Sequence, residues 1–200
     1  MIAGIVLAAG RSERMLRPKA LLPFKGSTMI ARVVDALLGG GVNHAIVVVP
    51  LGDREIRSAL GDRPVVLVEN PDRRADMLSS LRCGLRILPT DTRGILVSPM
   101  DQPSLRSELV RSMLEAYRNS RRPILVPVYQ GKRGHPLIIG TEFVAELLAS
   151  FDGLGLRGLL QAHPGGVGEW QSEDPAILED VDTPQDYKAA LTGVSPKKNS

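Results

Sequence analysis

The sequence contains one cysteine, Cys83, so no disulfide can form within the chain. This is typical of a reducing compartment, and we expect a cytoplasmic protein. The three histidines, His44, His135 and His163, are scattered, and no Cys/His spacing suits a zinc site. No apolar run approaches the ~20 residues that span a membrane, and no basic, cleavable leader precedes the first apolar run. These absences argue against disulfide-rich, zinc-binding and membrane proteins.

The sequence also lacks a large charge of either sign. It has 25 Lys and Arg residues against 22 Asp and Glu residues, a formal net charge of +3. Because a nucleic-acid coat protein carries a larger cationic excess, we expect no nucleic-acid partner. A length of 200 residues with 43% hydrophobic residues suits one domain with a sizeable core. We assign residues 1–192 to this domain and expect a disordered polar tail at 193–200.

Short apolar runs alternate with segments of helical apolar spacing. The run 2–7 is continuously apolar, as in a strand buried on both faces of a sheet. A hairpin-like stretch after residue 122 indicates at least one antiparallel strand. The sequence therefore predicts the α/β class, as a three-layer α/β/α sandwich with a mostly parallel, Rossmann-like sheet. Strands are expected at 2–7, 44–50, 64–69, 94–98, 123–129, 136–139, 167–173 and 177–180, and helices at 29–38, 52–60, 75–88, 104–117, 141–150, 155–162 and 183–191.

A loop of small residues follows the first strand, and four cations come directly after it. Small residues let backbone N–H groups approach phosphate oxygens, and cations offset the phosphate charge, so this combination suits a triphosphate. The loop has neither the P-loop pattern nor the G-x-G-x-x-G pattern of dinucleotide sites. Taken alone, it could equally be an ordinary strand-to-helix loop. After Leu7 the small residues are Ala8, Ala9 and Gly10, and the cations are Arg11, Arg14, Arg17 and Lys19.

Two aspartates are candidate metal ligands. Asp101 follows a predicted strand, where a carboxylate is well placed to hold Mg²⁺. It could instead be a turn residue ahead of a helix. Asp182 precedes a capping box in which Thr183 caps the last helix and Asp186 completes the motif. The box leaves Asp182 without a role, so Asp182 could be the second metal ligand.

Three further polar positions each have an ordinary alternative. Asn70 lies in a turn after the third strand, and Ser79 and Ser80 lie near a helix start. These side chains could cap and brace the chain or contact a ligand. His135 lies between Gly134 and Pro136, where it could face a ligand or belong to a turn that enters a strand.

Taken together, these motifs resemble the molybdenum cofactor cytidylyltransferase family, within the nucleotide-diphospho-sugar transferase superfamily. The resemblance spans nearly the whole chain. Ala9 and Ser12 are similar to the CTP-using members, since guanylyl-transferring relatives tend to have a second glycine at the position of Ala9. The motifs, in the family's order, are Leu7-Ala8-Ala9-Gly10-Arg11-Ser12-Glu13-Arg14-Met15, Lys19-Ala20-Leu21-Leu22, Asn70-Pro71, Ser79-Ser80-Leu81-Arg82-Cys83-Gly84, Asp101-Gln102-Pro103, Gly134-His135-Pro136 and Asp180-Val181-Asp182-Thr183-Pro184-Gln185-Asp186.

The resemblance implies that CTP and Mo-molybdopterin react to give molybdopterin cytosine dinucleotide and pyrophosphate, with Mg²⁺ as cofactor. A molybdenum enzyme or its chaperone would be the partner that receives the product. The implied catalytic residues are Lys19, Arg14 and Asp101, with Asp101 and Asp182 holding Mg²⁺ and His135 facing the acceptor. The implied nucleotide-binding residues are Leu7, Ala8, Ala9, Gly10, Arg11, Ser12, Lys19, Asn70, Ser80 and Asp101.

The sequence departs from the family pattern at two positions, Leu16 and Asp76, where glycine is usual. Since glycine allows a positive φ and close approach, these changes bear on nucleotide choice and on activity. Three alternatives stay open. The chain could use another nucleotide or phosphorylated acceptor, or it could carry molybdopterin without catalysis. Some relatives are oxidoreductases that act on nicotine-derived pigments, although this chain lacks a dinucleotide fingerprint.

Overall fold

The structure, a computed structural model, describes residues 1–10, 18–72 and 74–193. Its strands are β1 (Ile2–Leu7), β2 (Pro23–Phe24), β3 (Ser27–Thr28), β4 (His44–Pro50), β5 (Val65–Asn70), β6 (Gly94–Pro99), β7 (Ile124–Tyr129), β8 (Lys132–Arg133), β9 (Leu137–Gly140) and β10 (Val167–Gln171). Its α-helices are α1 (Met29–Gly40), α2 (Glu55–Leu60), α3 (Met77–Leu85), α4 (Ser107–Asn119), α5 (Val144–Ala149), α6 (Leu156–Ala162) and α7 (Pro184–Thr192). Four 3₁₀ turns are η1 (Lys19–Leu21), η2 (Thr141–Phe143), η3 (Pro164–Gly166) and η4 (Pro175–Leu178).

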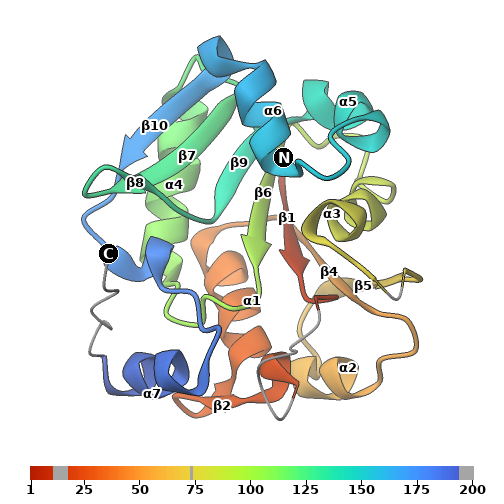
Figure 1. Ribbon diagram of the computed structural model, residues 1–200, viewed down its shortest axis with the longest axis vertical. Coiled ribbons are helices and arrows are strands. Elements are labelled where there is room, and N and C mark those ends of the chain that lie inside the picture. Colours follow the sequence, from red (N-terminus) through yellow and green to blue (C-terminus); the bar gives the residue numbers. More distant parts are fainter. Residues whose placement is uncertain (11–17, 73, 194–200) are drawn as a thin grey trace.

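One large sheet organises the molecule, with the strand order β10-β7-β9-β6-β1-β4-β5 (Figure 1). Strands β6, β1, β4 and β5 pair in parallel, and β10 pairs in parallel with β7. Strand β9 runs antiparallel to both β6 and β7, and β8 runs antiparallel to β7. The predicted α/β class, with a mostly parallel sheet and at least one antiparallel strand, is confirmed.

Helices cover both faces of this sheet because its central strands are apolar on both faces. On β1, Val6 packs into a core formed with α1, α2 and α4. Its neighbours Ile5 and Leu7 pack into the opposite core, with α3, α5 and α6. The alternation follows from the two-residue period of a strand. The three layers are visible in Figure 1.

Most predicted elements occur within a few residues of their expected bounds, but three differ. The prediction of a strand at 177–180 is wrong, because the 3₁₀ turn η4 covers the start of this segment. Pro175 opens the turn, and the Asp174 carboxylate accepts a hydrogen bond from the Ala176 N–H. The helix predicted at 141–150 divides into η2 and α5. The helix predicted at 75–88 is shorter, because the Asp76 side chain caps it at Met77.

The topology gathers the predicted site residues at one end of the sheet. Strands β1, β5 and β6 end at Leu7, Asn70 and Pro99, and β9 starts at that end because it runs the opposite way. In open α/β sheets, ligands bind beyond this carboxyl end. None of the helices in the described residues is both long enough and apolar enough to cross a membrane.

Candidate active site

Lys19 joins the two aspartates that the sequence singles out. Its side chain enters from η1, and the residue is only 8% exposed. The Lys19 Nζ lies 2.8 Å from Oδ1 of Asp182 and 3.4 Å from Oδ2 of Asp101. A buried ammonium needs such partners, since an unpaired buried charge is strongly destabilising. The structure thus brings together three predicted site residues from distant parts of the sequence.

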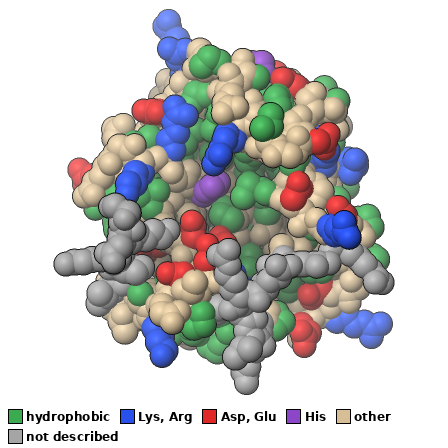
Figure 2. All heavy atoms as spheres, viewed as in Figure 1, with side chains coloured by type: hydrophobic (Ala, Val, Ile, Leu, Met, Phe, Trp, Pro, Cys, Tyr) green, Lys and Arg blue, Asp and Glu red, His purple; other side chains and the backbone are tan. Residues whose placement is uncertain are grey.

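Asp101 lies in a crowded, largely desolvated position just past the end of β6. Burial raises the pKa of its carboxyl group above the ordinary value, and the nearby Asp180 and Asp182 carboxylates raise this pKa further. Lys19 works in the opposite direction and lowers the same pKa. Burial raises the pKa of Asp101 by more than the single Lys19 ammonium lowers it. The ionised carboxylates here therefore favour additional cationic partners. Figure 2 shows acidic side chains gathered near the middle of the face, where β1 and β6 end in Figure 1.

The chain returns across this end of the sheet in residues 175–182, and Gln102 holds that segment in place. Gln102 is fully buried, and its Nε2 donates to the Ile177 carbonyl at 3.0 Å and to Oδ1 of Asp180 at 2.9 Å. The Val181 N–H donates to the Asp101 carbonyl oxygen at 2.8 Å. These bonds connect the end of β6 directly to the segment that carries Asp182.

A close backbone approach at Gly134 adds a second connection. A Cβ at Gly134 would lie 2.2 Å from the Ile177 carbonyl oxygen, so only glycine fits this position. The next residue, His135, donates its backbone N–H to the same carbonyl oxygen at 2.9 Å. The predicted Gly134-His135-Pro136 motif therefore fixes the returning segment and places His135 beside it.

Asp182 is positioned by the helix that follows it. The predicted capping box is present: Thr183 accepts from the Asp186 N–H, and Asp186 accepts from the Thr183 N–H. The Asp182 N–H also donates to the Asp186 carboxylate at 3.2 Å. The Asp182 side chain, 53% exposed, is left to contact Lys19 and solvent.

Asn70 and the two serines form a hydrogen-bonded cluster of their own. The Asn70 Nδ2 donates to the Ser79 and Ser80 hydroxyls, each at 3.2 Å, and its Oδ1 accepts from the Asp72 N–H. Asn70 is 3% exposed and Ser80 is 2% exposed. These bonds connect the end of β5 to the start of α3 and so shape this part of the site. Direct contact of Asn70 or Ser80 with a nucleotide stays a prediction.

The first loop is described only up to Gly10. Leu7, Ala8 and Ala9 are buried, and the Ala8 N–H is already bonded to the Val48 carbonyl oxygen at 2.8 Å. Gly10 is exposed, and a Cβ there would meet no described atom within 4 Å. The predicted contacts of Arg11, Ser12 and Arg14, the departure at Leu16 and the tail at 194–200 lie outside the described residues.

The two carboxylates have the chemistry to supply ligands to a divalent cation. No group of three or more His, Cys, Asp and Glu side chains in the described part of the chain has the arrangement of a metal site. Asp101 and Asp182 nevertheless share one positive partner, Lys19, and carboxylate oxygens are the ligands Mg²⁺ prefers. Mg²⁺ commonly takes one or two protein carboxylates and completes its shell with water and phosphate oxygens.

His135 faces a groove of about 720 Å³ next to this cluster. The groove has an apolar side, including Met77, Leu154 and Leu160, and two arginines, Arg133 and Arg157. Burial lowers the pKa of the His135 imidazole, although Asp180 partly opposes this shift. The groove therefore offers apolar area, guanidinium groups and a mostly neutral imidazole beside the carboxylates.

The profile of the MobA-like NTP transferase domain matches residues 4–167, more than three quarters of the chain. The chain belongs to the MobA-like NTP transferase family. This places it among the nucleotidyltransferases, as the motifs predict, and the match includes Lys19 and Asp101. Asp182 lies beyond it.

Relatives of this MobA-like protein differ in their named activities. Nicotine blue oxidoreductase of Paenarthrobacter nicotinovorans is 30% identical over 191 residues, which cover 91% of this chain and 92% of the relative. Molybdenum cofactor cytidylyltransferase of Escherichia coli (strain K12) is 23% identical over 187 residues, which cover 93% of each chain. The family is therefore established, while these names alone do not fix substrate or acceptor.

Solved structures give the same fold. The crystal structure of Rv0371c from Mycobacterium tuberculosis H37Rv has a TM-score of 0.82 at 28% identity, and the match covers 96% of this chain and 97% of that one. A second crystal structure of Rv0371c is a complex with manganese; it has a TM-score of 0.76 at 28% identity and covers 96% of this chain and 99% of that one. A similar protein thus binds a divalent cation.

Two residues of this MobA-like site were assigned no role from the sequence, Gln102 and Asp180. Both lie inside motifs that were recognised, immediately beside Asp101 and two residues before Asp182. Their function depends on a contact between residues 78 positions apart, and neither propensity nor spacing shows such a contact. Their inclusion in the ordered motifs was the only available signal.

Proposed function

We propose that this protein transfers CMP from CTP to Mo-molybdopterin, giving molybdopterin cytosine dinucleotide and pyrophosphate. The observation that carries the proposal is the position of Lys19 between Asp101 and Asp182, at the carboxyl end of the sheet. A nucleotidyl transfer needs a cation for the reacting phosphate and carboxylates for a divalent metal. Membership in the MobA-like family supports the same class of reaction.

In this proposal, the terminal phosphate of molybdopterin attacks the α-phosphorus of CTP in line, and pyrophosphate leaves. Lys19 lies near the α-phosphate and stabilises the charge that develops on its oxygens. Asp101 and Asp182 would hold Mg²⁺, which would supply positive charge to neutralise the phosphates. Lys19 then exchanges carboxylate partners for a phosphate oxygen. The chain performs no covalent chemistry, so its contribution is positioning and charge stabilisation.

The remaining nucleotide contacts belong to the first loop and to the turn after β5. Gly10 is exposed, and no described atom lies within 4 Å of a Cβ placed there, which suits the approach of a phosphate to the backbone. Arg11, Ser12 and Arg14 are proposed to continue this contact. Ala9 and Ser12 support cytosine as the base. We assign Asn70 and Ser80 to the wall of the base or ribose site, which their mutual bonds hold in shape.

The groove beside His135 is our candidate for the acceptor site. A pterin is flat and polar at its edges, and molybdopterin carries a phosphate. The groove supplies an apolar side for such a ring, and Arg157 is exposed at it. Arg133 also lines the groove, although it is paired with Glu169 at 2.8 Å. A neutral His135 can accept a hydrogen bond from the ring or donate one to it.

Turnover with a nucleotide panel tests this function. Purified protein, Mg²⁺ and Mo-molybdopterin are incubated with CTP, GTP or ATP, and the dinucleotide product and pyrophosphate are measured. We expect product with CTP and much less with GTP. If product forms only with GTP, the assignment of CTP as the substrate is overturned, whereas nucleotidyl transfer as the type of reaction is supported. If molybdopterin accepts no nucleotide, a screen of other phosphorylated acceptors decides between another transferase and a non-catalytic carrier.

A second candidate function is oxidoreduction, because nicotine blue oxidoreductase is 30% identical over most of the chain. Calorimetry of CTP and NADPH, with and without Mg²⁺, separates the two candidates. Nucleotidyl transfer predicts CTP binding that is strengthened by Mg²⁺. Tight, Mg²⁺-independent NADPH binding without a CTP signal would replace our proposal with the oxidoreductase.

A further inference from the structure

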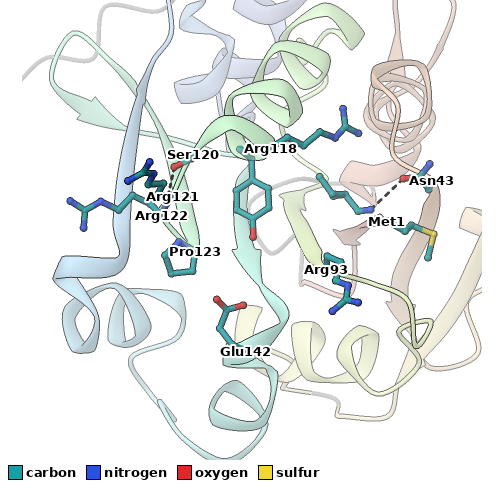
Figure 3. Close-up of a pocket in the computed structure, with 11 residues that line it drawn as sticks. Met1, Asn43, Arg93, Arg118, Ser120, Arg121, Arg122, Pro123 and Glu142 are labelled. Atoms are coloured by element: carbon teal, nitrogen blue, oxygen red, sulfur yellow. Dashed lines mark hydrogen bonds between the residues drawn. The ribbon is translucent and has the colours of Figure 1, made fainter.

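A second hollow lies at the opposite end of the sheet from the candidate active site. It has a volume of about 680 Å³ and lies where β1, β6 and β7 begin. These strands have six residues each, so at ~3.3 Å per residue the two sites are roughly 20 Å apart. We call it the arginine hollow, after the four arginines that line it: Arg93, Arg118, Arg121 and Arg122. Figure 3 shows them around it, with Glu142 on the opposite side from Arg118.

The charges of the arginine hollow are unbalanced. The four guanidinium groups are accompanied by a single lining carboxylate, that of Glu142. Among residues 1–10, 18–72 and 74–193, no carboxylate forms an ion pair with any of the four. Elsewhere in the same part of the chain, arginines do find carboxylates: Arg63 pairs with Asp35, Arg82 with Asp152, Arg106 with Asp174 and Arg133 with Glu169. The four arginines are exposed and give the lining of one hollow an excess of positive charge, so an anion there would be stabilising.

The backbone that carries three of these arginines is held in place. The Arg122 N–H donates to the Ser120 hydroxyl at 3.0 Å, and the Arg122 side chain donates to the Gly165 carbonyl oxygen. Arg118 belongs to the last turn of α4, and Arg93 directly precedes β6, with its N–H bonded to the Met1 carbonyl oxygen. Arg93 and the stretch 118–122 therefore present guanidinium groups from two anchored segments, which lowers the entropy lost on binding.

The hollow also has room and a flat surface for more than a phosphate group. The Tyr117 ring packs over the start of β6, where a Cβ on Gly94 would lie 2.8 Å from it. Tyr117 and Pro123 both line the hollow, and its volume is within the usual range for small-molecule sites. Glu142 can accept hydrogen bonds from hydroxyl or amino groups. Burial and the Glu142 charge raise the pKa of Tyr117, so its hydroxyl stays protonated and can donate.

We propose that the arginine hollow binds a small phosphate-bearing anion at a site separate from the candidate active site. Guanidinium groups suit phosphate oxygens because their N–H groups are arranged for paired hydrogen bonds. The ligand is inorganic phosphate, pyrophosphate or a nucleotide. This binding does not depend on the proposed cytidylyl transfer.

Calorimetry of pyrophosphate and ADP, at constant ionic strength and with EDTA present, tests the site. The Lys19→Ala protein is titrated beside the wild type, because it weakens the candidate active site and leaves the arginine hollow intact. The test variant is Arg93→Gln/Arg121→Gln. The matched control is Arg54→Gln/Arg57→Gln, which removes two exposed arginines near α2. Thermal unfolding confirms that each variant is folded.

We expect one binding event that survives Lys19→Ala. The affinity for the anion should fall at least ~10-fold in Arg93→Gln/Arg121→Gln, since two charge-assisted contacts are lost. The affinity should stay unchanged in the control. ADP binding more tightly than pyrophosphate would identify a nucleotide, whereas equal affinities would identify the phosphate group alone. The proposal is overturned by absent binding, by loss of binding in Lys19→Ala, or by equal weakening in the control. Binding of an acidic polypeptide with neither small anion would also overturn it.

Discussion

The Nζ of Lys19 lies 2.8 Å from Oδ1 of Asp182, although 163 positions separate the two residues in the sequence. The same ammonium reaches Asp101. Both carboxylates that would hold Mg²⁺ therefore already contact the ammonium that would stabilise the reacting phosphate. Nucleotide and metal binding must then redistribute these partners.

Lys19→Met should separate catalysis from metal binding. Without the ammonium, the charge that develops at the α-phosphate is unsupported, and turnover should fall at least ~10²-fold. The two carboxylates also lose a competing cation, so Mn²⁺ should bind the nucleotide-free variant more tightly than the wild type. Electron paramagnetic resonance titration of Mn²⁺ measures the second effect. Lys25→Met, at an exposed neighbouring position, is the control and should change neither quantity. Equal Mn²⁺ affinities in wild type and Lys19→Met would contradict the proposed exchange.

Gly10→Ala should impair nucleotide binding without destabilising the fold. A Cβ at Gly10 would meet no described atom within 4 Å, and Gly10 has no positive φ. The free energy of unfolding, measured by thermal unfolding, should therefore stay within about 0.5 kcal/mol of the wild-type value, as is usual for surface substitutions. CTP affinity should fall because the methyl group enters the space where a phosphate would approach the backbone. Gly165→Ala, equally open and far along the chain, should leave both properties unchanged. Full CTP affinity in Gly10→Ala would remove this residue from the site.

Gln102→Leu should lower both stability and turnover, although Gln102 would touch no substrate. The substitution removes the bonds to the Ile177 carbonyl and to Asp180, at a cost of about 1–3 kcal/mol for buried groups. The segment that carries Asp182 then loses its connection to the end of β6, so kcat should decrease more than the affinity for CTP. Thr92→Val is the comparison, since the buried Thr92 hydroxyl has no hydrogen-bond partner in the described chain. Urea unfolding and steady-state kinetics of both variants decide whether Gln102 acts as a positioning residue.

His135 should make the protein less stable as the pH falls. Burial lowers its pKa in the folded protein below the unfolded value of about 6.5. Between these two pKa values the unfolded chain binds more protons, so the free energy of unfolding decreases as the pH falls through this window. Above pH 6.5 the contribution is fully present. His135→Gln should flatten the decline, which urea unfolding from pH 8 to pH 5 measures. If the free energy of unfolding falls equally with pH in the wild type and in His135→Gln, His135 does not cause the loss of stability.

The central sheet could be predicted from the sequence because strands that are buried on both faces appear as continuous apolar runs. Runs such as β1 and β4 are continuously apolar, and few other structures produce that pattern. The last helix was equally readable, since Thr183, Pro184 and Asp186 form a local capping motif. That motif also leaves Asp182 without a local role, which is why it is predicted from the sequence as a second metal ligand with Asp101.

Long-range contacts limited the rest of the prediction. Ile177 is apolar and looked like part of a strand, but its carbonyl oxygen accepts from Gln102 and from His135 instead of from a neighbouring strand. Asn70 and Ser80 looked available to a ligand, yet they bond to each other. The arginine hollow combines Arg93 with the arginines of 118–122, and only the fold brings these two segments together. In each case the decisive partner lies on another element, which one-dimensional patterns do not record.

Pyrophosphate release from CTP and Mo-molybdopterin, compared between wild type and Asp101→Asn, tests the central claim most directly. Burial and neighbouring carboxylates raise the pKa of Asp101, so removing its charge should not lower the unfolding temperature. We predict Mg²⁺-dependent release by the wild type and a loss of at least ~10²-fold in a folded Asp101→Asn protein. Unchanged release by Asp101→Asn, or wild-type release that persists in EDTA, would contradict a metal-dependent nucleotidyl transfer at Lys19, Asp101 and Asp182.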